Sequence, residues 1–135
     1  IKNLLTLLFI ISWLIVGAEG FRNMYVREEF EDFKGDRLVL FWAEWCPHCR
    51  TIKSKENEEE PKQWDILEQR GGVQTSKGKI PAINYEIDEA PELFEKFEVK
   101  SFPTVMLIRS DGSTQVQKEG ARTVKGWEEF VRKMV

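Results

Sequence analysis

The sequence has few of the residues from which proteins build metal sites and disulfide scaffolds. Its 135 residues include two cysteines and one histidine. Two cysteines are too few for a disulfide-stapled miniprotein or a four-thiolate zinc site, and one histidine excludes a histidine-rich metal cluster. A phosphate-binding loop is also lacking, since Gly71-Gly72 has none of the flanking residues of such a motif. The sequence therefore predicts no metal site.

Positive charge is scarce for a protein that binds nucleic acid. Lys and Arg number 20 against 23 Asp and Glu, which gives a formal net charge of -3. A general phosphate-binding surface needs an excess of positive charge, so nucleic acid is not an expected partner. Hydrophobic residues make up 41% and charged residues 32%, a balance typical of globular proteins. The length fits one domain, and we expect a monomer.

A long hydrophobic run occurs near the N-terminus. The thirteen residues Leu4–Val16 carry no charge, and the segment 17–20 (GAEG), in which all but Glu19 are small, follows them. A membrane-spanning helix needs about 20 apolar residues, whereas the core of a signal peptide needs about 7 to 15. We therefore expect residues 1–20 to be a signal peptide. The alternatives are a membrane anchor retained through residues 4–18 and a core helix, although a segment apolar on all faces suits a small domain badly.

The remaining residues, 21–135, are predicted to form one α/β domain. Residues 37–43 and 80–87 are short apolar runs of the kind that forms buried strands. A helix is predicted to begin at Pro47 and to continue until Pro61 interrupts it. The other expected elements are a helix over 27–34, an exposed loop over 71–79, a helix over 90–97, a hairpin of 104–109 and 114–118, and an amphipathic helix over 124–134.

The two cysteines and the histidine occur together, in the sequence Cys46-Pro47-His48-Cys49. Thiols with this spacing at a helix start can form a disulfide with little backbone movement. Cys46 would lie at the first turn, where unpaired N–H groups favour the thiolate, which is the attacking species. Cys49 would lie one turn further and resolve the mixed disulfide. His48 would add positive charge or a hydrogen-bond donor beside the Cys46 thiolate, which would make the pair a better disulfide donor.

Two other interpretations of the cysteine pair remain open at this point. Zinc needs four ligands, whereas this chain offers two thiols and one adjoining imidazole. A purely structural disulfide would close a very short loop and remove little entropy from the unfolded chain. The spacing therefore favours redox chemistry over both alternatives.

Several further motifs follow in order along the chain. They are the segment 38–49 (LVLFWAEWCPHC), Ile87-Asp88, the segment 101–104 (SFPT), Asp111-Gly112 and the segment 119–121 (EGA). In this order and spacing they resemble the thioredoxin superfamily over about residues 30–135. The resemblance implies the thioredoxin fold, an α/β fold with a central mixed β-sheet flanked by helices, here preceded by the hydrophobic leader.

The resemblance also implies a substrate-binding groove. Pro103 would be preceded by a cis peptide bond and lie against the cysteines, and the backbone of Phe102 would pair with a bound substrate strand. Trp45 and Pro47 are also expected to contact the substrate. Trp45 is expected to be exposed or half-exposed beside Cys46.

One position departs from the family pattern. Many thioredoxins and disulfide isomerases have a buried acidic residue, thought to shuttle a proton for the second cysteine, where this chain has Leu40. Asn84 stands where thioredoxins often have a lysine near that acid. The usual route of proton transfer to Cys49 is therefore in doubt.

These observations together predict a thiol–disulfide oxidoreductase. Cys46 and Cys49 would exchange disulfides with cysteine-containing client proteins, in the oxidase or isomerase direction, and a second thiol–disulfide partner would recharge them. No cofactor is expected beyond the redox-active Cys46–Cys49 disulfide. The leader predicts a secretory lumen (endoplasmic reticulum) or a periplasm. The alternatives are a membrane-anchored disulfide reductase and a redox-inert chaperone or binding module, against which the intact cysteine pair argues.

Overall fold

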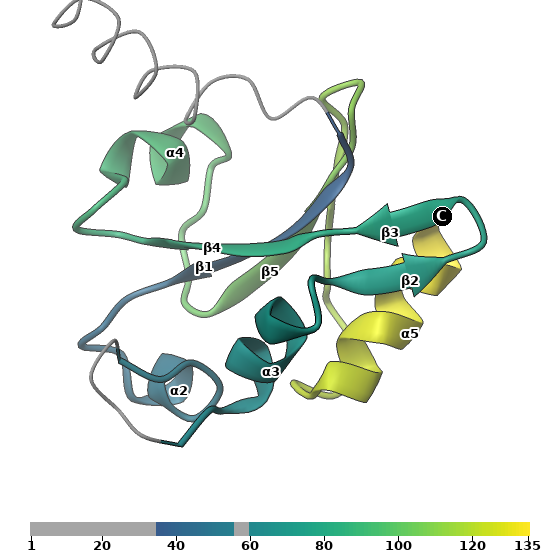
Figure 1. Cartoon of the computed structure of the whole chain (residues 1–135). Coiled ribbons are helices and arrows are strands. Elements are labelled where there is room, and N and C mark those ends of the chain that lie inside the picture. Colours follow the sequence, from purple (N-terminus) through teal and green to yellow (C-terminus); the bar gives the residue numbers. More distant parts are fainter. Residues whose placement is uncertain (1–34, 56–59) are drawn as a thin grey trace, which may run out of the picture. The chain divides into compact units, whose positions relative to one another are not determined.

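The computed structural model describes residues 35–55 and 60–135 (Figure 1). The predicted leader, the boundary at residue 20 and the helix expected over 27–34 lie outside the described residues. In the part that is described, no helix is both long and apolar enough to cross a membrane.

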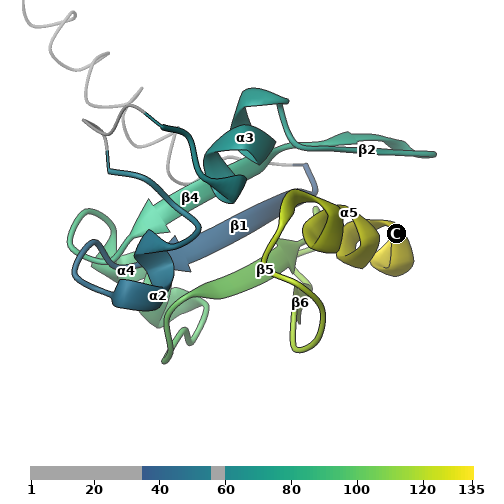
Figure 2. The same ribbon diagram turned by 90° about the horizontal axis from the view of Figure 1, so that it is seen from below.

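A mixed four-stranded sheet, in the order β4-β1-β5-β6, forms the centre of the fold (Figure 2). The central strand β1 (Arg37–Trp42) pairs in parallel with β4 (Ala82–Glu86) and antiparallel with β5 (Thr104–Ile108). The edge strand β6 (Thr114–Val116) pairs antiparallel with β5. Every residue of β1 after the first is buried, which confirms the prediction of a buried strand from this apolar run.

Helices cover both faces of the sheet, as the thioredoxin fold implies (Figure 1). The short helix α4 (Pro91–Lys96) packs on one face. The other face is covered by α2 (Pro47–Arg50), α3 (Gln63–Gln69) and α5 (Val124–Met134). The expected architecture, a mixed sheet flanked by helices, is confirmed.

The closing helix α5 is held at its start by three contacts. The Thr123 hydroxyl accepts a hydrogen bond from the Gly126 N–H at 3.1 Å, which caps the helix. The Gln63 side-chain oxygen accepts the Val124 N–H at 3.0 Å. A Cβ at Gly126 would lie 2.1 Å from the Ala121 carbonyl oxygen, so glycine is needed for the preceding segment to approach the helix. The amphipathic helix over 124–134 is confirmed.

The helix predicted from Pro47 to Pro61 is wrong, because α2 ends at Arg50. Beyond it, the Asp65 carboxylate accepts the backbone N–H groups of Ser54 at 3.0 Å and Lys62 at 2.9 Å. The Ser54 N–H would serve a helical carbonyl if the helix continued. A side chain from α3 therefore draws this segment away from the helix.

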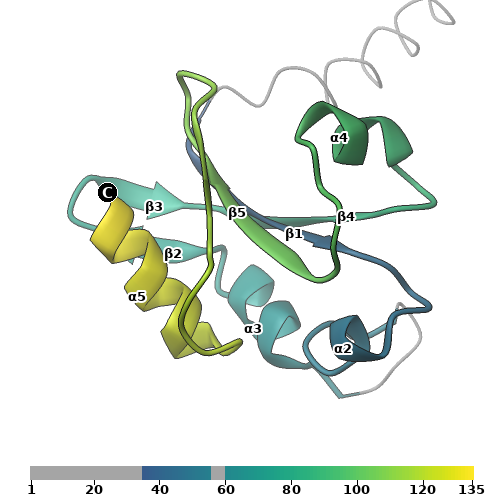
Figure 3. The same ribbon diagram turned by 180° about the vertical axis from the view of Figure 1, so that it is seen from behind.

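The loop expected over 71–79 is also wrong, because this segment forms a β-hairpin beside α5 (Figure 3). The strands β2 (Val73–Thr75) and β3 (Gly78–Ile80) pair antiparallel, and Val73 is fully buried. Gly72 has φ +112°, and a Cβ there would lie 2.0 Å from the Ile80 carbonyl oxygen. The strand expected over 80–87 is divided at Pro81, which has no N–H to donate.

Candidate active site

The two cysteines lie at the end of the sheet where β1 leads into α2. Cys46 is the residue that precedes the first turn of α2 and is 7% exposed, while Cys49 lies within the helix and is fully buried. Both are free thiols. The Cys46 thiol lies 3.9 Å from the backbone oxygen of Phe102, at the limit of a weak S–H donor contact. The fold thus joins the cysteine motif to a segment 56 residues away.

Burial makes the two thiols chemically unequal. It raises the pKa of Cys49 to about 12, and a hydrogen bond with Cys46 adds to this rise, while the positive charge of Arg122 opposes it. Cys49 is therefore protonated at neutral pH and shielded from solvent. Cys46 is the thiol that lies closer to the surface, which fits the order of attack and resolution predicted from the sequence.

The residues predicted to form the groove gather on both sides of Cys46. The Trp45 side chain is 64% exposed, and its ring meets the Phe102 ring edge-on with centroids 5.6 Å apart. The Phe102–Pro103 peptide bond is cis, as the resemblance implied. Pro47 is exposed at the start of α2. These four residues surround the edge at which Cys46 meets the backbone of Phe102.

His48 is exposed on α2. Its backbone oxygen accepts a hydrogen bond from the Thr51 hydroxyl at 2.7 Å. Its ring makes no hydrogen bond with any other residue within 35–55 and 60–135. The tuning role predicted for His48 therefore stays a prediction.

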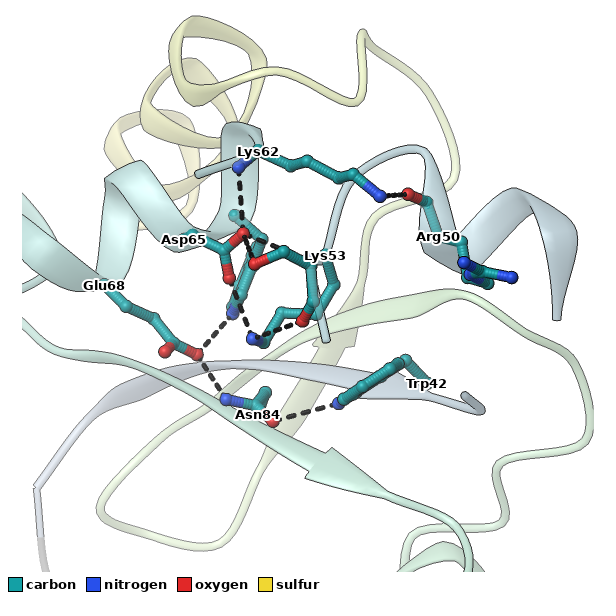
Figure 4. Close-up of polar contacts among 9 residues, drawn as sticks. Trp42, Arg50, Lys53, Lys62, Asp65, Glu68 and Asn84 are labelled. Carbon is teal, nitrogen blue, oxygen red and sulfur yellow. Dashed lines mark hydrogen bonds and ion pairs between the residues drawn. The ribbon is translucent and has the colours of Figure 1, made fainter. Parts of the chain in front are cut away.

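The sheet face behind the cysteines carries a chain of polar side chains (Figure 4). Leu40 is fully buried there, and its register partner on β4 is Asn84. The Trp42 indole N–H donates to Asn84 Oδ1 at 2.9 Å, and Asn84 Nδ2 donates to Glu68 Oε1 at 2.5 Å. The same Glu68 oxygen accepts the Trp64 indole N–H at 2.7 Å. A carboxylate of α3 thus reaches the sheet face on which the chain has Leu40 in place of an acid.

A second carboxylate on this face, that of Asp65, fastens the segment after α2 (Figure 4). Lys53 Nζ lies 2.8 Å from Asp65 Oδ1 and 5.4 Å from the centre of the Trp42 ring. Asp65 Oδ2 accepts the Ser54 hydroxyl at 2.5 Å together with the N–H groups of Ser54 and Lys62. Burial alone would raise the pKa of Asp65, but the hydrogen bonds from Lys53 and Ser54 outweigh it and lower the pKa. Asp65 therefore remains ionised and holds the loop.

Glu86 holds the segment before the cysteines. Its side chain is buried at the end of β4. One carboxylate oxygen accepts the Glu44 N–H at 3.2 Å, and the other accepts the N–H groups of Asp88 at 2.7 Å and Glu89 at 3.2 Å. These bonds tie the residues just before Trp45 to the turn after β4.

Sequence analysis did not single out Asp65, Glu68 or Glu86. Asp65 and Glu68 are three residues apart on a helix, which places them on one side of it, but this spacing is common on solvated faces. Lys53 is 12 residues from Asp65, and Asn84 is 16 residues from Glu68. The pairing of these groups depends on how α3 packs, which no local pattern encodes. Among the described residues, no group of three or more His, Cys, Asp and Glu side chains could hold a metal ion.

The thioredoxin family model matches residues 22–133, and the chain belongs to the thioredoxin family. Relatives include a thioredoxin of Listeria monocytogenes, 32% identical over 108 residues that cover 78% of this chain and 91% of that protein. The protein disulfide-isomerase like 2-2 of Arabidopsis thaliana is 29% identical over 93 residues, 69% of this chain and 18% of that protein. The chain therefore spans less than a fifth of that isomerase.

Solved structures agree on the fold. The first thioredoxin domain of mouse protein disulfide-isomerase A4 superposes with a TM-score of 0.59 at 21% identity, covering 79% of this chain and 68% of that one. Human ERp44 gives a TM-score of 0.55 at 16% identity, covering 74% of this chain and 27% of that one. At these identities the likeness establishes the thioredoxin fold.

Proposed function

We propose that the protein is a thiol–disulfide oxidoreductase that exchanges disulfides with client proteins through Cys46 and Cys49. The observation that carries this proposal is the unequal placement of the two thiols. Cys46 lies at the edge of the fold beside the backbone of Phe102, and Cys49 is buried one turn behind it. The thioredoxin and disulfide-isomerase relatives support the same general chemistry.

Exchange proceeds in two displacements. When the protein acts as an oxidase, a client thiolate attacks Sγ of Cys46 in the Cys46–Cys49 disulfide, and Cys49 leaves as a thiolate that takes up a proton. A second client thiolate then attacks the client sulfur of the mixed disulfide and releases Cys46. The client gains one disulfide, and the protein gains the two thiols seen in the structure. A separate disulfide-bearing partner must recharge the pair.

The groove supplies the binding surface for the client. Trp45 and Phe102, whose rings contact each other, offer aromatic surface beside Cys46, and an extended client segment can run along the backbone before Pro103. We propose the oxidase or isomerase direction because the leader predicts an oxidising lumen and His48 adjoins the reactive thiol. A membrane-anchored reductase remains the alternative.

A trapping experiment tests the proposal. The Cys49→Ser variant is reduced and incubated with a synthetic peptide whose single cysteine forms a disulfide with glutathione, so that the peptide has no second thiol. We expect a mixed disulfide with Cys46 to accumulate, because the resolving thiol is absent. The matched control is the double variant Cys46→Ser, Cys49→Ser, which should trap nothing. If Cys49→Ser also traps nothing, the protein is a redox-inert binding module and the proposed function fails.

The direction is tested by the reduction potential measured against glutathione. A value near the roughly -180 mV of protein disulfide isomerase supports oxidation or isomerisation, and a value near the roughly -270 mV of thioredoxin supports the anchored reductase. Replacing His48 with Gln should make the potential more reducing. An unchanged potential would remove the role assigned to His48.

A further inference from the structure

A pocket opens next to the point where Cys46 meets Phe102. Its lining includes Pro103, Ile52 and Val105. Pro103 directly follows the residue that contacts Cys46, and the Ile52 N–H donates to the Cys49 carbonyl at 3.1 Å. The pocket therefore borders the segments that carry both cysteines and lies where a client joined to Cys46 would extend.

The rest of the lining carries charged side chains and is called the charged wall below. It consists of the segment 117–120 and Arg122, from the connection between β6 and α5. Two of these side chains are cations, Lys118 and Arg122, and one is an anion, Glu119. All three are exposed, and none of them forms a hydrogen bond or ion pair through its side chain with another residue in the described part of the chain. The wall therefore has one excess positive charge and no internal partner that neutralises it.

Several contacts hold this wall in place. The Gln117 N–H donates to the Val105 carbonyl at 2.9 Å, which fixes the start of the connection on β5. Its end is fixed where Ala121 packs on Gly126 and where the Gln63 side chain accepts the Val124 N–H. The positive charge of Arg122 also acts on Cys49, since it lowers the pKa of that thiol against the effect of burial. The charged wall is thus positioned within electrostatic reach of the cysteine pair.

We propose that this pocket, lined by Lys118 and Arg122, selects client segments that carry a carboxylate close to the reacting cysteine. The inference rests on the proposed function, because a client must first reach Cys46. Lys118 and Arg122 attract an Asp or Glu side chain of the client and disfavour a Lys, while Glu119 opposes them and limits the preference. Exposed charges of this kind change the rate of association more than the final affinity, and salt screens them.

The test uses synthetic peptides with one cysteine activated as a disulfide with thiopyridine. The peptides differ in one residue, which is Glu, Gln or Lys, placed in turn at the two positions on either side of the cysteine. The reduced Cys49→Ser protein attacks the peptide sulfur through Cys46, and the released thiopyridine reports the second-order rate. We expect the Glu peptide to react about three- to tenfold faster than the Lys peptide at low salt, and the ratio to approach one at high salt.

Three variants that each remove one charge, made in the same Cys49→Ser background, test whether the pocket causes the preference for the Glu peptide. Lys118→Gln should lower the ratio of the Glu rate to the Lys rate, and Glu119→Gln should raise it. The matched control is Lys125→Gln, which removes a charge from an exposed position of α5 that does not line the pocket and should leave the ratio unchanged. Arg122 is left intact because its charge also acts on the resolving thiol.

The outcomes separate this inference from the proposed function. Equal rates for the Glu, Gln and Lys peptides overturn the selectivity while exchange through Cys46 stands. Equal effects of Lys118→Gln and Lys125→Gln assign the preference to net charge and also overturn the role of the pocket. If no peptide forms a mixed disulfide with Cys46, the proposed function fails and the selectivity fails with it.

Discussion

The two faces of the central sheet differ in how they are packed. On the α4 face, Val39 and Phe41 contact apolar and aromatic side chains. The centroid of the Phe41 ring lies 5.1 Å from that of Phe94 and 5.8 Å from that of Tyr85. On the opposite face, the cysteines share the core with paired polar groups, the Trp42–Asn84–Glu68 chain and the Lys53–Asp65 ion pair. One strand, β1, contributes alternate residues to both faces.

The two faces therefore have different roles: the α4 face mainly stabilises the fold, and the cysteine face also determines where the segments that carry the thiols lie. Apolar burial is non-directional and mainly stabilises the fold. Buried polar groups must find partners with defined geometry, so they add less net stability but determine where the segments around them lie. Here they fasten both the segment before Cys46, through Glu86, and the segment after Cys49, through Asp65. We therefore expect substitutions on the α4 face to change stability and substitutions on the cysteine face to change the thiols as well.

The largest expected effect comes from Phe41→Ala on the α4 face. Phe41 is fully buried among three aromatic rings, so the cavity should lower the free energy of unfolding by about 3 to 5 kcal/mol. Urea denaturation measures this change. In the fraction that remains folded, Cys46 should still be alkylated before Cys49. If the order of alkylation changes, the two faces are coupled and the contrast between them fails.

The Asp65→Asn substitution on the cysteine face should lower the free energy of unfolding by a smaller amount, about 2 to 3 kcal/mol. The reason is that hydrogen bonds to a charged group are lost and Lys53 loses its partner. The folded pKa of Asp65 lies below its usual value. Its contribution is therefore present at neutral pH and lost as the pH falls through that lowered pKa.

Stability measured between pH 7 and pH 3 checks this prediction, and the variant should lose less stability on acidification than the wild type. Asp111→Asn is the matched control, since Asp111 is exposed and bonds its neighbour Ser113 within a turn. If Asp111→Asn changed the acid dependence of stability as much as Asp65→Asn, the role of Asp65 in fixing the segment between α2 and α3 would be contradicted.

The smallest effect concerns the Cys49 thiol, which is neutral at physiological pH. Its pKa rises from about 9 to about 12 on folding. The reduced protein should therefore keep this contribution below pH 9 and lose it as the pH rises toward 12. The Cys49→Ser variant should lose less stability than reduced wild type between pH 8 and pH 10. Identical alkaline profiles would show that burial does not hold the thiol neutral.

Local sequence patterns were enough to predict a large part of the fold. The apolar run at β1, the amphipathic period at α5 and the Asp111-Gly112 turn each depend on residues that are close in sequence. The motif Cys46-Pro47-His48-Cys49 was found in the same way. Its neighbour Phe102 and the cis bond before Pro103 followed from the family resemblance and are confirmed.

The wrong predictions concern two segments, one that is held by the side chain of another helix and one that pairs with itself. Pro61 predicted where the helix after Cys49 would break, but α2 ends at Arg50, and Asp65 accepts N–H groups of the segment that follows. Gly72 predicted a loop, but the chain pairs with Ile80 to form a hairpin that α5 covers. In the first case hydrogen bonds to a side chain of another helix outweighed the local propensity. In the second case the pairing partners Val73 and Ile80 are only seven residues apart, and the hairpin that they form lies against α5.

The scarcity of cysteine and histidine, their spacing and the family motifs determined the family and the candidate redox pair from the sequence alone, because these signals are local and chemically specific. The tertiary structure decided how unequal the two thiols are, since burial raises the pKa of Cys49. It also brought Glu68 to the sheet face on which Leu40 replaces an acid, and Lys118 and Arg122 to the pocket beside Pro103. These arrangements come from packing between distant segments, and only the folded chain brings such groups into contact.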